Sequence, residues 1–122
     1  MYAERHTITL TTDASGDATG YIPVTYGRII NLIYTKTDYA DGVGLTITAE
    51  ATGQTLWEEL DVDASKIVAP RQPTHTTAGV AAVYEDAGEA VLDHIVLAMD
   101  RIKIVVASGG DGKSGTFTAV IG

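Results

Sequence analysis

The sequence contains no cysteine among its 122 residues. Without thiols the chain is neither a disulfide-stapled secreted scaffold nor a zinc ribbon nor a thiol enzyme. Basic residues are also scarce, with eight Lys and Arg against sixteen Asp and Glu and a formal net charge of −8. Affinity for nucleic acid comes mostly from clustered Lys and Arg that contact phosphates. The charge therefore argues against nucleic acid as a partner.

Long hydrophobic runs are missing as well. The longest apolar stretches, such as Val80 to Tyr84, are far shorter than the roughly 20 residues that span a bilayer. The first residues, Met1 to His6, do not combine a basic segment with an apolar segment as a secretory signal does. We therefore expect no membrane partner and synthesis in the cytoplasm of the producing cell.

What is present is period-two alternation rich in Thr, Val, Ile and Tyr, which is typical of β-strands. It is clearest in His6 to Thr12, Leu45 to Ala51 and Arg101 to Ala107, and Gly- and Asp-rich turns separate such segments. No segment keeps a 3.6-residue apolar period long enough for the crossover helices of a parallel sheet. The pattern predicts one all-β domain spanning residues 1–122, an antiparallel β-sandwich or jelly-roll-like barrel of about eight short strands with little helix.

Three segments carry more detailed expectations. Gly20 to Tyr26 is expected to form a short strand whose Pro23 marks an edge or a bulge. Arg28 to Lys36 is apolar on both faces and is expected to be a separate, central strand covered on both sides. In Gln54 to Leu60 the buried set is either Leu56 with Leu60 or the alternate phase that holds Trp57, and the sequence does not choose between them.

Two loop motifs fall short of known ligand sites. Gly112-Lys113-Ser114 resembles the end of a phosphate-binding loop, but Ala107 stands where the first glycine belongs and a strand follows in place of a helix. Asp61 to Ser65 resembles the start of a calcium loop, but Lys66 and Gln72 occupy the positions that require Gly and Glu.

No catalytic constellation is recognisable either. The three histidines, His6, His75 and His94, are too far apart in sequence for a local metal motif. The acid pairs Glu58-Glu59 and Glu85-Asp86 are adjacent, so in a strand their side chains face opposite sides. We therefore expect a non-enzymatic protein with no catalytic, cofactor-binding or metal-binding residues and no cofactor.

The least regular part of the chain runs from 61 to 79 and contains two of the three prolines. Irregular segments of this length in a compact domain are uncommon unless they bind something. We therefore expect a long loop or arm around residues 61–79 that pairs with a neighbouring subunit. The candidate assembly interface consists of Pro70, Arg71, Gln72, Pro73, Thr74, His75, Thr76 and Thr77.

Three stretches together carry a family resemblance: Ala3 to Gly16, Ala69 to Ala81, and Asp100 to Gly110 with Gly115 to Phe117. With them the chain resembles small all-β virion structural proteins encoded in the head–tail gene module of tailed bacteriophages and prophages. The resemblance spans nearly the whole chain and rests on overall pattern, with no active site to carry over.

The resemblance implies a virion component made in the bacterial host cytoplasm. The expected function is that of a capsid decoration (head accessory) protein that binds the major capsid protein, stabilises the head and forms a homo-oligomer such as a trimer. The alternatives are a tail, baseplate or head–tail joining protein, and, from Trp57 and the six tyrosines, a carbohydrate-binding or adhesion module. The charge of −8 suits the outer surface of a capsid or a tail lumen through which DNA slides.

Overall fold

The computed structural model describes residues 3–122, except the side chain of Val24, and confirms the all-β prediction. Strands and their turns account for the regular structure of this part of the chain, and no helix occurs in it. The nine strands within residues 3–122 are β1 (Glu4–Thr11), β2 (Ala18–Lys36), β3 (Gly44–Ala49), β4 (Thr55–Glu59), β5 (Lys66–Val68), β6 (Arg71–Pro73), β7 (Leu92–His94), β8 (Val96–Ala107) and β9 (Ser114–Ile121).

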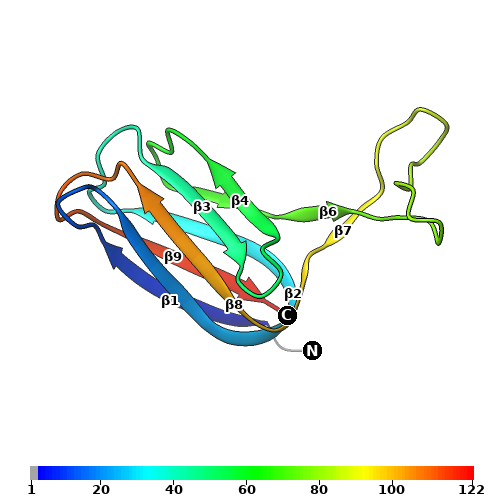
Figure 1. Cartoon of the computed structure of the whole chain (residues 1–122), viewed down its shortest axis with the longest axis horizontal. Helices are drawn as coiled ribbons and strands as arrows, with labels where there is room; N and C mark the ends of the chain where they lie inside the picture. Colours follow the sequence, from blue (N-terminus) through cyan, green and yellow to red (C-terminus); the bar gives the residue numbers. More distant parts are fainter. Residues whose placement is uncertain (1–2) are drawn as a thin grey trace.

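Seven of the strands form an antiparallel sandwich whose two layers share β2 (Figure 1). The first half of β2 pairs with β8, which continues to β3 and β4. The second half of β2 lies between β9 and the short β5, and β9 continues to β1. The apolar core fills the space between these two layers. The strand that the two layers share therefore ties them together covalently.

The prediction of two separate strands in this region was wrong, because β2 runs without a break from Ala18 to Lys36. Its pairing with β8 shifts register between Ile22 and Thr25 and again between Thr25 and Gly27. Of the edge or bulge expected at Pro23, the first shift shows the bulge, and Gly27 supplies a left-handed φ of 123°. These irregularities bend the strand without ending it.

A further bulge explains the apolar pattern of the second half of β2. Its pairing with β9 shifts register between Ile29 and Asn31, so the buried phase changes from Ile29 to Leu32 and Tyr34. Ile33 faces the other side and is only half-buried. Complete cover on both faces was therefore a wrong expectation, because the outer face of this sheet is left partly open to solvent.

The undecided phase of the β4 segment is settled by the same kind of irregularity. Ile47 pairs with Trp57 and Thr48 with Thr55, so Leu56 is the extra residue of a bulge. Leu56 and Trp57 are therefore both buried, at 6% and 7% exposure. Leu60 lies beyond the end of the strand and is exposed.

Three aromatic rings fill one part of the core. Tyr34 stacks on Phe117 with ring centroids 5.3 Å apart and on Tyr39 at 6.0 Å. Gly115 is required beside them, since a Cβ there would lie 2.4 Å from the ring of Tyr39. The Tyr39 hydroxyl donates a hydrogen bond of 2.7 Å to the carbonyl of Leu10. The ring cluster thus joins β2, β9 and the end of β1.

This cluster predicts a loss of stability at alkaline pH. Burial, with smaller contributions from Tyr34 and Asp38, raises the pKa of Tyr39 to about 12 from an ordinary value of 10. The neutral phenol is favoured in the folded state, so its contribution is complete below pH 10 and is lost as the pH rises toward 12. A two-unit shift corresponds to about 2–3 kcal/mol of unfolding free energy. Urea unfolding between pH 8 and pH 12 should show this decline.

Tyr39→Phe is the matched control for that measurement. It should cost about 1 kcal/mol at neutral pH for the lost hydrogen bond and should decline less than the wild type above pH 10. Equal declines in the two proteins would contradict the assignment to Tyr39.

Candidate assembly interface

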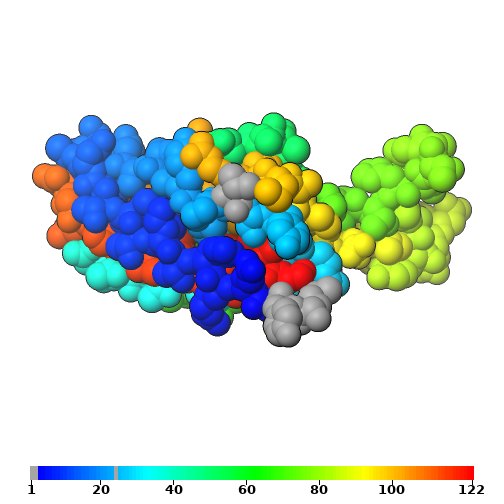
Figure 2. Space-filling view, turned by 90° about the horizontal axis from the view of Figure 1, so that it is seen from below, coloured from blue at the N-terminus to red at the C-terminus, as the bar shows by residue number. Residues whose placement is uncertain are grey.

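Residues 71–94 leave the sandwich as a single projection, here called the arm, which stands clear of the sandwich in Figures 1 and 2. Pro70 and Ile95 are buried on either side of its root, and no residue between them is buried. A segment of this size cannot bury enough apolar surface to be stabilised by a core of its own. The arm is therefore a structured element whose side chains face solvent on all sides.

Backbone hydrogen bonds give the arm a defined path. At the root β6 pairs with β7, with Arg71 opposite His94. Farther out, isolated bridges join His75 to Ala81 and Val83 to Ala90. The chain thus runs outward from the root, turns back at residues 76–80 and then runs outward again. A second turn, closed by the hydrogen bond from the Tyr84 N–H to the Glu89 carbonyl (3.0 Å), returns it to the root. The arm is a small twisted meander.

Polar side chains fasten the root of the arm to the sandwich. The Gln54 amide nitrogen donates to the Gln72 side-chain oxygen (2.9 Å), and the Gln72 nitrogen donates to the His94 carbonyl (3.1 Å). The Arg71 guanidinium donates to the carbonyl of Pro70 (2.8 Å). Because these contacts connect both limbs with the β3–β4 hairpin, they set the direction in which the arm leaves.

The arm exposes four large apolar side chains. Tyr84 is 74% exposed, Val80 62%, Leu92 53% and Val83 43%. Single exposed apolar residues are ordinary on a soluble protein, whereas four on one projection make it the candidate surface for contact with another molecule.

The tip of the arm is also acidic. Glu85, Asp86 and Glu89 lie around its second turn, and no Lys or Arg occurs between Arg71 and the end of the arm. Nearer the root, a hydrogen bond from the His94 backbone N–H (2.7 Å) is the main cause that lowers the pKa of Asp93. Two tips placed side by side would repel each other.

The predicted interface residues form only the first limb of the arm. Pro70 is buried in its base, Gln72 and Thr74 are half-buried, and the exposed members are Arg71, Pro73, His75, Thr76 and Thr77. The irregular segment was expected at 61–79, but Lys66 to Val68 belong to the sandwich as β5 and the projection extends to residue 94. That these residues form an assembly interface stays a prediction.

Sequence reasoning missed the second half of the arm, residues 78–94. A usable signal was present, since Val80, Val83 and Tyr84 occur beside the acidic turn at Glu85 and Asp86 without the alternation of a long strand. Apolar residues without strand or helix periodicity have no obvious core position within the same chain.

The two incomplete ligand motifs have structural roles instead. Lys113 and Ser114 lie where the loop between β8 and β9 runs into β9, with no helix at hand. Asp63 of the calcium-like segment accepts the Gly42 N–H (2.7 Å) and stabilises a turn.

Within residues 3–122 no three His, Asp or Glu side chains gather as a metal site would require. The same part of the chain contains no helix long and apolar enough to cross a membrane.

The three histidines lie in different parts of the structure. His6 contacts the Glu4 carboxylate (3.1 Å) at the start of β1, His94 lies beside Asp93 at the root of the arm, and His75 is on the first limb.

Comparison with known proteins found no matching family model and no matching curated protein sequence. Among solved structures the chain is similar to the virus-like particle of the extra small virus of the prawn Macrobrachium rosenbergii, with a TM-score of 0.38, 10% identity, and coverage of 98% of this chain and 78% of that one. It is similar to the exo-β-1,3-galactanase of Phanerochaete chrysosporium (TM-score 0.30, 13% identity, 96% and 27% coverage). It is also similar to infectious bursal disease virus strain Gx (TM-score 0.29, 14% identity, 99% and 33% coverage). Two of these three structures are virus particles, and at such TM-scores the likeness assigns neither a family nor a function.

Proposed function

We propose that this chain is a non-enzymatic structural component of a tailed-phage virion, a capsid decoration protein that binds the major capsid protein and assembles through its arm. One observation carries the proposal: the arm is an ordered projection with no core of its own and four exposed large apolar side chains. Such an element gains stability only when another subunit covers it.

The sandwich suits such a role. Its layers are tied together by β2, and the core between them contains no residue of the arm, so the sandwich forms a rigid block that does not depend on the arm. A rigid block with a projecting connector is an arrangement that permits symmetric assembly from many copies. The net charge of −8 suits a position on the outside of a DNA-filled shell, where no direct contact with DNA is needed.

Quantitative mass spectrometry of gradient-purified virus particles from the strain that carries the gene tests this function. We expect hundreds of copies per particle, in a fixed ratio to the major capsid protein, and density for the chain on the outside of the head in cryo-electron micrographs. About a dozen copies would indicate a connector or baseplate protein instead. Absence from the particles, with binding to immobilised glycans by a monomer, would overturn the virion role.

A further inference from the structure

One long edge of the sandwich is left without a neighbouring strand. Within residues 3–122, β1 pairs with β9 alone and is the last strand of its layer. Figure 2, which views the molecule from below, shows the dark blue atoms of β1 at the surface and the arm well away from them. The eight residues of β1 pair in an unbroken register, without a bulge or a proline. A long, regular edge of this kind readily accepts a further strand.

The direction of the unpaired backbone groups of β1 follows from its pairing with β9. The Thr12 N–H donates to the Lys113 carbonyl at 2.8 Å, on the side of β9. Successive residues of a strand alternate the side to which their N–H and C=O groups point, so the odd-numbered residues of β1 direct theirs to the free side. These residues are Arg5, Thr7, Thr9 and Thr11. Each of them therefore offers one donor and one acceptor to an incoming strand.

The inward face of β1 is incompletely covered as well. Leu10 is buried, whereas Ile8, two residues earlier on the same face, packs against the core and stays only half-buried. A strand added beside β1 would bring a side chain directly next to Ile8. The edge thus lacks both backbone partners and part of its apolar cover.

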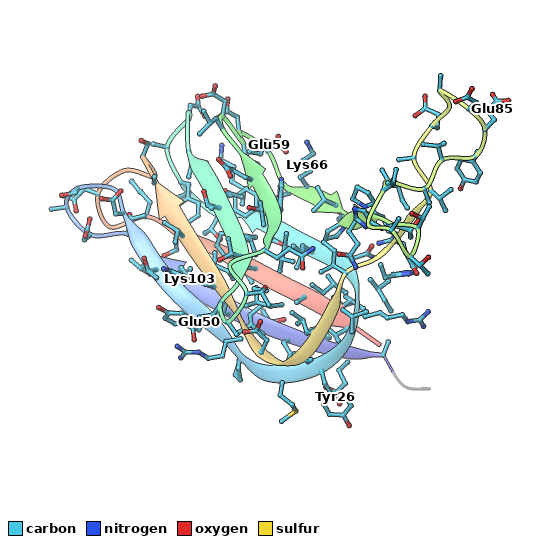
Figure 3. All side chains as sticks on the ribbon, turned by 45° about the vertical axis from the view of Figure 1, so that its right-hand side comes forward. Tyr26, Glu50, Glu59, Lys66, Glu85 and Lys103 are labelled. Carbon is cyan, nitrogen blue, oxygen red and sulfur yellow. The ribbon has the colours of Figure 1, made fainter. Side chains whose placement is uncertain are left out.

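The opposite side of the sandwich is protected. There β4 has only five residues, contains the bulge at Leu56 and ends on Glu58 and Glu59. Lys66 of β5 donates to both carboxylate oxygens of Glu59 (2.9 and 3.0 Å), so an ion pair joins the two layers at this side (Figure 3). Bulges and charged side chains are common means of preventing the addition of a strand. The edge at β1 has neither between Arg5 and Thr12.

We propose that β1 pairs antiparallel with β1 of a second copy of this chain, with the two-fold axis at Ile8. This register places Ile8 opposite Ile8 of the second copy, so each covers the other. It places Thr7 opposite Thr9 and directs the free backbone groups of each copy at those of the other. The contact is isologous, as in most two-fold oligomers.

The charges along the strand favour a second copy as the occupant. The chain as a whole carries −8, but no Asp or Glu occurs between Glu4 and Asp13, so two β1 strands approach without repulsion along their length. In the proposed register Arg5 of one copy lies diagonally across from Asp13 of the other, at both ends of the contact. Asp13 uses Oδ1 for the N–H groups of Ser15 and Asp17 (2.9 and 3.1 Å), and its other oxygen is left for the guanidinium.

The proposal rests on the arm-mediated assembly proposed above and adds a second contact to it. Pairing of one strand from each copy is a small contact, so it is weak on its own. Between copies that the arms hold together, the effective concentration of the two edges is high and the contact forms. A sandwich without its arm is therefore expected to stay monomeric.

The absence of cysteine makes a clean crosslinking test possible. One preparation carries Thr7→Cys and a second, of different mass, carries Thr9→Cys, both on the exposed face of β1. Directly opposite residues of an antiparallel pair have Cα atoms about 5 Å apart, within the range of a disulfide. After mixing and mild oxidation, we expect a species that contains one chain of each kind. The matched control replaces Thr9→Cys with Glu58→Cys on β4 and should yield no such species.

A charge reversal tests the same register. Arg5→Glu places an acid across from Asp13 of the second copy and should lower the rate of this crosslinking at least about fivefold. Lys103→Glu makes the same change on β8, in the other layer (Figure 3), and should leave the rate unchanged. Equal rates for the two variants would contradict the register.

The outcomes separate this contact from the role of the arm. If the protein assembles but the disulfide between positions 7 and 9 does not form, the β1 contact is wrong while arm-mediated assembly stands. If the disulfide forms although the protein is a monomer at every concentration tested, the β1 contact stands and arm-mediated assembly is wrong. If the protein is a monomer and no disulfide forms, both proposals fail.

Discussion

Replacing residues 71–94 with a short Gly-Ser turn should leave a folded sandwich that remains monomeric. The ends are ready for such a closure, because Arg71 and His94 are opposite each other in an antiparallel pair, and two to four residues suffice to connect such strands. No member of the arm belongs to the core cluster, so the free energy of unfolding should change by no more than about 1 kcal/mol. Mass photometry reports the loss of assembly, and urea unfolding reports the retained fold.

A surface variant separates the role of the arm's apolar side chains from that of its backbone. Substituting Val80, Val83, Tyr84 and Leu92 by Ser keeps the arm and should also yield a monomer. A deletion variant that still forms the wild-type assembly would show that another surface joins the subunits. A deletion variant that does not fold would show that the arm belongs to the structural core.

Phe117→Ala should cause the largest loss of stability, about 3–5 kcal/mol. Phe117 is 2% exposed and stacks on Tyr34, so truncation removes ring contacts and leaves a cavity between β2 and β9. Domains of this kind are stable by roughly 5–15 kcal/mol, so such a loss is a large part of the total.

Phe117→Leu is the control for that experiment, because it keeps most of the volume and should cost less than Phe117→Ala. The comparison is best made in the arm-deleted protein, where unfolding is not coupled to assembly. If the two variants were equally stable, the aromatic cluster would not be a centre of the fold.

The sequence predicted the all-β class and most strands, because the alternation of apolar and polar residues along a strand reflects which of its faces is buried. The expectation of cover on both faces was wrong in β2, and the phase of β4 stayed undecided, because the bulges at Ile30 and Leu56 each add one residue that reverses inside and outside without altering composition. Gly27 was misread as a break between two strands, because a glycine can either end a strand or bend it. Only pairing with the neighbouring strands decides between these outcomes.

The candidate site was harder to predict than the fold. Proline and polar content pointed to Pro70 to Thr77, but the arm extends to residue 94. A half-open pocket beside the start of β8 could not be anticipated at all, since its lining residues Glu4, Arg28, Val96 and Gly122 are distant in sequence and meet only because β2 bends and β1 pairs with β9.

The pairing of β1 with β9 also determines when the protein can fold. Glu4 is opposite Ile121, and Thr7 bonds to Thr118 through their hydroxyls at 3.0 Å. The layer formed by β1, β9, β5 and the second half of β2 therefore lacks β9, its middle strand, until β9 has left the ribosome. The strands of the other layer are all synthesised once β8 is complete. The arm emerges before either sheet can close. Closure of a chain with such distant contacts is slow compared with that of a helical domain, so the exposed apolar residues of the arm are accessible to other molecules before the sandwich has closed.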